Sequence, residues 1–295
     1  MEVRRSRGNF DVFSNHAWYV PGVSGMFILL AWLIAGALIG NVVTLLFSLA
    51  GIGGSSMEYG MLVSYPVMFI PPMLYAAFKS RNNSLSSPGL ELDSANFPPL
   101  GGVKCALLAA VATLAASFAT DAINSAMPPM PEWLEEALGS MTGGTLWVDF
   151  LLVSIMAPFF EEWLCRGMVL RGLLGKDIKP VWAIIISAAF FAVIHANPWQ
   201  AIPAFILGCL FGYVYYRTGS LKLTMLMHFT NNTMALVATN IWSESETWFD
   251  IVGKMYWAYF VLALVVLGLV ILAFRRIPLK TPRGNCDPVE PLFGA

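Results

Sequence analysis

Long apolar stretches separated by short polar segments make up most of this chain of 295 residues. The hydrocarbon core of a membrane is about 30 Å thick, and a helix of roughly 20 residues crosses it at 1.5 Å per residue. Eight stretches come near or exceed that length, so the pattern predicts an all-α, polytopic membrane bundle of about eight transmembrane helices. The expected spans are approximately Met26–Ala50, Met61–Phe78, Cys105–Thr120, Leu146–Phe160 continuing toward Leu170, Val181–Ala196, Ala201–Tyr216, Leu223–Ile241 and Met255–Phe274.

The composition agrees with a membrane protein and excludes several other classes. Hydrophobic residues make up 57% of the chain and charged residues 12%, whereas soluble domains carry about 25% charged residues. A formal net charge of −1 provides no basic surface for nucleic acid. The four cysteines have no spacing typical of a disulfide framework. We therefore expect an integral, multi-pass membrane protein with membrane lipid, and not nucleic acid, as a partner.

The basic residues predict the orientation, because short cytoplasmic loops are enriched in Lys and Arg. With the N-terminus inside, fifteen of the seventeen basic residues fall on inner segments, and both termini are then cytoplasmic. The expected organisation is a cytoplasmic leader over residues 1–25, a transmembrane bundle over 26–274 and a cytoplasmic tail over 275–295. Gly36-x-x-x-Gly40 and Gly208-x-x-x-Gly212 predict close approach between helices.

Ionisable and amide side chains inside the spans are candidates for function, because burying them in a membrane is costly. Within the fourth span, Glu162 and Arg166 are four residues apart and can neutralise each other on one helix face. Glu161 is turned about 100° away from that face and lacks such a partner. Pro158 removes a backbone donor one turn earlier. A helix-stabilising charged cluster is the structural alternative.

Two histidines lie on later spans. His195 ends the fifth span, just before Asn197 and Pro198 interrupt the helix. His228 and Asn232 are four residues apart on the seventh span, so both side chains project from one face. Without further information each histidine could equally serve packing or hydrogen bonding between helices.

These side chains together could hydrolyse an amide. A carboxylate beside an imidazole can deprotonate water, while a second imidazole and a carboxamide can donate hydrogen bonds to an oxyanion. Glu161, His195 and His228 also match the ligand count of a catalytic zinc site, so zinc is the alternative cofactor. The residues alone leave both chemistries open.

Three motifs resemble those of the CAAX-protease and bacteriocin-processing (CPBP, or Abi/Rce1-like) membrane proteins. They are Glu161-Glu162-x-x-x-Arg166, Phe191-x-x-x-His195 and His228-x-x-x-Asn232, in that order on separate spans. The resemblance covers a core of about residues 148–236. It implies an intramembrane endopeptidase in a multi-pass protein of the bacterial cytoplasmic membrane. The resemblance does not identify the substrate, which we expect to be a hydrophobic or lipidated peptide or protein.

The resemblance also implies roles for individual residues. Glu161 would activate water with His195 as its partner, and His228 and Asn232 would stabilise the oxyanion. Metal-independent glutamate chemistry without a cofactor is favoured over a metalloprotease. The supporting residues would be Glu162, Arg166 and Phe191.

A function without catalysis is the main alternative. A bacteriocin-immunity or peptide-binding membrane protein could keep the scaffold without cleaving. A proton-coupled transporter is a third interpretation, since Glu and His side chains can relay protons.

Overall fold

The computed structural model describes residues 15–51, 56–84, 86, 89–142, 145–241 and 248–279. Most of the predicted leader and most of the predicted tail lie outside these residues. The elements in chain order are β1 (His16–Ala17), α1 (Val23–Ala50), α2 (Ser56–Asn83), β2 (Leu90–Glu91), α3 (Gly102–Asn124), α4 (Glu132–Thr142), α5 (Leu146–Asp149), η1 (Phe150–Met156), α6 (Ala157–Glu162), η2 (Trp163–Leu170), α7 (Arg171–Leu174), α8 (Pro180–Val193), α9 (Pro198–Thr218), α10 (Leu221–Ile241), α11 (Trp248–Val252), η3 (Gly253–Met255) and α12 (Tyr256–Arg275).

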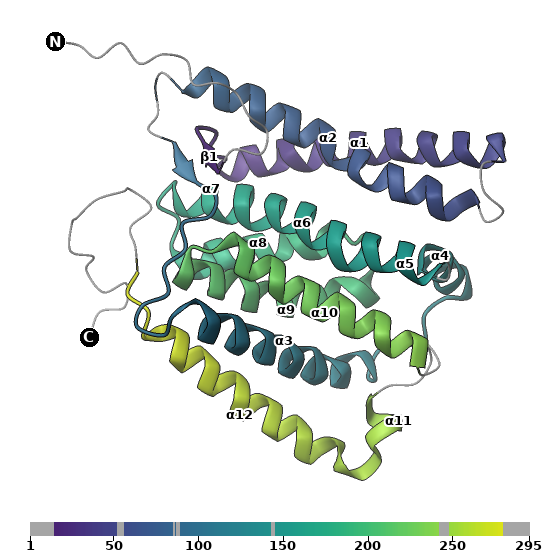
Figure 1. Ribbon diagram of the computed structural model, residues 1–295, viewed down its shortest axis with the longest axis vertical. Helices are drawn as coiled ribbons and strands as arrows, with labels where there is room; N and C mark the ends of the chain where they lie inside the picture. Colours follow the sequence, from purple (N-terminus) through teal and green to yellow (C-terminus); the bar gives the residue numbers. More distant parts are fainter. Residues whose placement is uncertain are drawn as a thin grey trace.

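The long helices lie side by side in one bundle, which confirms the predicted all-α class (Figure 1). The hairpin of α1 and α2 covers one side, and α3 with α12 forms the opposite side. Between them lie α8, α9, α10 and a continuous helical segment from α5 to α7, here called the fourth-span helix (Leu146–Leu174). The three candidate motifs therefore lie in the middle of the bundle, on these helices or, for His195, just beyond the end of α8.

Five of the described helices are long and apolar enough to cross a membrane. Large apolar side chains on α1 and α12 face outward, and Leu49 and Leu269 are examples that are 75% and 62% exposed. Exposed apolar surface of this extent suits contact with lipid. The chain is therefore an integral, multi-pass membrane protein, while the count of eight spans stays a prediction. The five helices are Val23–Ala50, Tyr59–Asn83, Gly102–Asn124, Pro198–Thr218 and Trp248–Arg275.

Residues 15–22, which belong to the predicted cytoplasmic leader, pack against the bundle at one end. β1 pairs antiparallel with β2, and helix α1 begins at Val23. Arg171 links these segments, because its guanidinium donates to the carbonyl oxygens of Tyr19 and Leu90 at 2.8 and 2.9 Å. Arg171 is only 4% exposed. The guanidinium of Arg171 thus donates to carbonyl oxygens from three chain segments.

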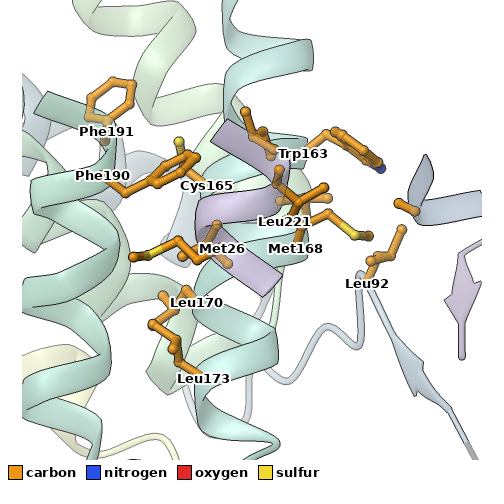
Figure 2. Packing of buried hydrophobic residues seen from close by; sticks show 14 of the residues in the cluster. Met26, Leu92, Trp163, Cys165, Met168, Leu170, Leu173, Phe190, Phe191 and Leu221 are labelled. Carbon is orange, nitrogen blue, oxygen red and sulfur yellow. The ribbon is translucent and has the colours of Figure 1, made fainter. Parts of the chain in front are cut away.

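A large apolar cluster lies between the hairpin and the fourth-span helix. Leu29 of α1 and Phe69 of α2 are fully buried in it, as are Leu164 and Leu170. Figure 2 shows Trp163, Met168 and Leu221 in this packing, close to Leu92 from the segment that follows β2. Dense packing of this kind fixes the rotation of the helix that carries both candidate glutamates.

Gly36 allows α1 and α2 to approach each other closely. A Cβ atom at Gly36 would lie 2.0 Å from the carbonyl oxygen of Met68, so the backbones would have to separate. We expect Gly36→Ala to lower the stability of the protein by about 1–3 kcal/mol, as overpacking in a core does. Thermal unfolding in detergent would measure the loss. Gly268→Ala on α12 is the matched control, because a Cβ there meets nothing within 4 Å, and equal losses in both variants would contradict the prediction.

Candidate active site

The helix that carries both glutamates departs from regular α-helical geometry on either side of them. Pro158 has no backbone N–H and interrupts the usual pattern of hydrogen bonds. The turns before and after α6 are π-helical, and the N–H of Ala157 accordingly reaches back five residues to the carbonyl oxygen of Leu152. π-Helical turns within α-helices are frequent at functional sites. Glu161 and Glu162 occupy the short α-helical segment between the two.

Glu162 lies in a buried polar network with Arg166 and His228, here called the Glu162 network. Glu162 Oε1 accepts from Arg166 Nη1 at 2.7 Å and from His228 Nδ1 at 3.0 Å. The side chains of Glu162 and Arg166 are both fully buried. The predicted intrahelical ion pair is therefore present, and the same carboxylate also fixes the imidazole of α10. Since a carboxylate only accepts hydrogen bonds, His228 Nδ1 carries a proton.

Arg166 is held by further contacts across the bundle. Its Nη2 donates to the carbonyl oxygen of Gly208 on α9 at 3.0 Å. The guanidinium carbon lies 4.7 Å from the ring centroid of Phe191 and 5.4 Å from that of Phe211. Aromatic faces stabilise a desolvated guanidinium. Gly208 belongs to the second predicted glycine motif, and a Cβ there would lie 3.1 Å from Ala188 Cβ, so α8 and α9 do approach closely.

Glu161 directs one of its two carboxylate oxygens toward α2. Its Oε1 accepts a hydrogen bond of 2.5 Å from the hydroxyl of Tyr65. Its Oε2 is buried and has no hydrogen-bond partner among the described residues, and it lies 3.9 Å from His228 Nε2. The side chain as a whole is 14% exposed. One carboxylate oxygen is therefore engaged, while the other faces the imidazole of His228.

His195 lies just beyond the C-terminal end of α8. Its Nδ1 is 2.8 Å from the carbonyl oxygen of Phe191, and because a carbonyl only accepts, Nδ1 carries the proton and Nε2 has the lone pair in the neutral ring. The amide of Asn197 donates to the carbonyl oxygen of His195 at 2.9 Å and fixes this turn. The ring of Phe191 packs edge-on against both His195 and His228, with centroids 5.0 and 5.4 Å apart.

Asn232 contacts the fourth-span helix away from the glutamates. Its Nδ2 donates to the carbonyl oxygen of Val153 at 2.9 Å, and its Oδ1 accepts from Asn231. One of its two amide N–H groups is thus engaged, which leaves the other available. Among the described residues, neither Asn232 nor His195 hydrogen-bonds directly to Glu161.

The structure thus brings Glu161, Glu162, Arg166 and His228 together directly, and links His195 to them through the ring of Phe191. Sequence reasoning missed Tyr65, Gly208 and Phe211 as contacts of this cluster. The tyrosines of an apolar span give no sign of which helix each of them faces. Only the packing of α2 beside the fourth-span helix puts Tyr65 next to Glu161.

The residues were also considered as ligands of a metal ion. Over the part of the chain that the structure describes, no group of three or more His, Cys, Asp or Glu side chains is placed to hold one. His228 turns Nδ1 toward Glu162, and the nearest approach of its Nε2 to Glu161 is 3.9 Å. Glu161, His195 and His228 therefore do not form a ready ligand set.

Comparison with known proteins adds an independent finding. Residues 143–234, about a third of the chain, match the family model described as type II CAAX prenyl endopeptidase Rce1-like. No curated protein and no solved structure gave a significant match. The matched range contains all three motifs, so the resemblance seen in the sequence is confirmed. It supports a membrane protease of the CAAX endopeptidase type acting on a peptide or protein. Residues 143–234 of this membrane bundle are thus similar to the type II CAAX prenyl endopeptidases described as Rce1-like.

Proposed function

We propose that the protein is a glutamate-type intramembrane endopeptidase in which Glu161 activates the attacking water. The observation that carries the proposal is the difference between the two adjacent glutamates. Each carboxylate keeps one buried oxygen without a hydrogen-bond partner among the described residues, but Oε1 of Glu162 pairs with Arg166 and His228, whereas Oε1 of Glu161 accepts only from the phenol of Tyr65. A carboxylate in that situation suits a general base, because it can accept a proton without breaking an ion pair.

The reaction then needs only water and the peptide. Glu161 Oε2 takes one proton from water as the water oxygen attacks the carbonyl carbon of the scissile bond. The tetrahedral intermediate carries its negative charge on the former carbonyl oxygen. When it collapses, the C–N bond breaks and the proton held by Glu161 passes to the leaving nitrogen. His195 Nε2, which is the unprotonated nitrogen of the neutral ring, would accept a hydrogen bond from the same water and orient it.

His228 and Asn232 would stabilise the oxyanion. His228 Nε2 can donate when the ring carries protons on both nitrogens. Asn232 contributes its second amide N–H. A buried donor directed at an oxyanion is worth roughly a hundred- to a thousandfold in rate.

The substrate would be a hydrophobic or lipidated segment, because the cluster lies among helices of a membrane bundle. The part of this proposal beyond a peptide in a membrane rests on the family resemblance alone, as does a location in the bacterial cytoplasmic membrane. Purified protein in liposomes, given a panel of prenylated and unmodified hydrophobic peptides, would test it. We expect cleavage of at least one peptide and its loss in His195→Ala. A panel left intact by protein that is folded by thermal unfolding would contradict the proposal.

Metal removal separates the glutamate chemistry from the zinc alternative. Because the candidate ligands do not form a ready ligand set, we expect dialysis against a chelator to change the cleavage rate by less than about twofold. This is well below a tenfold change, which corresponds to about 1.36 kcal/mol of activation free energy. The initial rate before and after chelation, with a known zinc protease as a control for the chelator, is the measurement. Loss of activity that added zinc restores would instead show that a metal takes part.

A further inference from the structure

The active site is incomplete within the region that matches the family. Tyr65 lies on α2, far outside residues 143–234, yet its hydroxyl makes the only hydrogen bond that Glu161 receives from a side chain among the described residues. The phenol is the donor and the ionised carboxylate the acceptor, which makes this a charge-assisted bond. Its length of 2.5 Å is at the short limit for such bonds.

Aromatic packing holds the ring of Tyr65 in place. The ring centroid of Tyr65 is 5.5 Å from that of Phe69 on the same helix and 6.5 Å from that of Phe160. Phe69 is fully buried and stacks on Phe160 at 5.1 Å. Since Phe160 directly precedes Glu161, the same packing that docks α2 on the fourth-span helix brings the hydroxyl to the carboxylate. The side chain is therefore oriented before any substrate binds.

The hydrogen bond distinguishes the two oxygens of Glu161. The terminal torsion of a glutamate is broad, so a carboxylate without partners can present either oxygen. Here Oε1 is held by Tyr65, and Oε2 is left facing His228 Nε2. A general base is effective only when the accepting oxygen is kept within hydrogen-bond reach of the water.

We propose that Tyr65 is a positioning residue, which holds Glu161 so that Oε2 stays directed at the catalytic water. The proposal rests on the role of Glu161 put forward above, and it extends the working site beyond the family region to the α1–α2 hairpin. Tyr65 acts through Glu161 and takes no proton in the reaction.

Tyr65→Phe tests this, because it removes the hydroxyl and keeps the ring that packs on Phe69 and Phe160. We expect kcat to fall roughly 10- to 100-fold, as loss of a hydrogen bond to a charged group does, with KM within about threefold. Tyr75→Phe is the matched control, since Tyr75 lies on the same helix and packs on Tyr19 and Trp32, away from Glu161. It should leave kcat unchanged.

A double variant separates positioning through Glu161 from a merely structural effect. In Glu161→Asp the shorter carboxylate does not reach Tyr65, so adding Tyr65→Phe should lower the remaining activity by less than twofold. A further 10-fold loss in that background, or wild-type kcat in Tyr65→Phe alone, would overturn the proposal. A thermal midpoint lowered so far in Tyr65→Phe that loss of folded protein accounts for the fall in kcat would also overturn the proposal.

The role of Glu161 itself is tested in the same assay. If Glu161→Gln is inactive while Tyr65→Phe is fully active, only the positioning role fails. If Glu161→Gln cleaves at the wild-type rate, the proposed function fails as well.

Discussion

Replacing Arg166 with methionine is expected to destabilise the folded protein by about 3–5 kcal/mol, the usual cost of leaving one charge of a buried pair uncompensated. Both side chains of the Glu162–Arg166 pair are fully buried, and the guanidinium also donates to Gly208 on another helix. Methionine fills a similar volume, so the loss reports on charge more than on packing. Chemical or thermal unfolding in detergent micelles would measure it.

Two comparisons make this prediction specific. Glu162→Gln combined with Arg166→Met removes both charges and should recover most of the lost stability. Lys222→Met breaks the pair of Lys222 with Asp93, in which Lys222 is 85% exposed, and should cost less than about 1 kcal/mol. Similar losses in the free energy of unfolding for Arg166→Met and Lys222→Met would contradict a specific stabilising role of the Glu162 network.

Replacing Glu161 with glutamine should lower kcat by roughly a hundred- to ten-thousandfold, the range that general-base catalysis contributes. Glutamine keeps the shape and can still accept from Tyr65, so folding and KM should change little. Initial rates over a range of peptide concentrations separate the two parameters. Glu135→Gln, an exposed acid on α4, is the control and should have wild-type kinetics. A Glu161→Gln enzyme with more than a tenth of the wild-type kcat would rule out this base.

Apolar patterning predicted the helices well, because burial in lipid requires long uninterrupted apolar segments. Each expected span has a helix in the structure, and spacing alone identified the Glu162–Arg166 pair, since residues four apart meet on a helix. The loss of a donor at Pro158 was also predictable, although its outcome, π-helical turns on both sides of α6, was not.

Contacts between helices were not predictable from one sequence. Tyr65 reaches Glu161 across 96 residues of chain, and His228 reaches Glu162 across 66. Spacing within a helix contains no information on such pairs. Arg171 shows the same limit, because its charge suggested a position at the membrane surface while its carbonyl partners come from β1, β2 and its own helix. Segments that fold back onto the bundle have no apolar periodicity from which their position could be predicted.

Among the described residues, the hydrogen bonds of His195 and Asn232 go to Phe191 and Val153 and not to Glu161, so their proposed roles require a bound substrate. Hydrogen bonds of catalytic groups often tighten only when the substrate is bound.

The central claim is that Glu161 acts in catalysis and not in peptide binding. The most direct test measures binding and cleavage of one peptide by the same Glu161→Gln sample in liposomes, beside the wild-type protein. Our account predicts a Kd within about threefold of the wild-type value, a difference below 1 kcal/mol, together with almost no product in a single turnover. Product formed at the wild-type rate, or binding lost in parallel with cleavage, would contradict it.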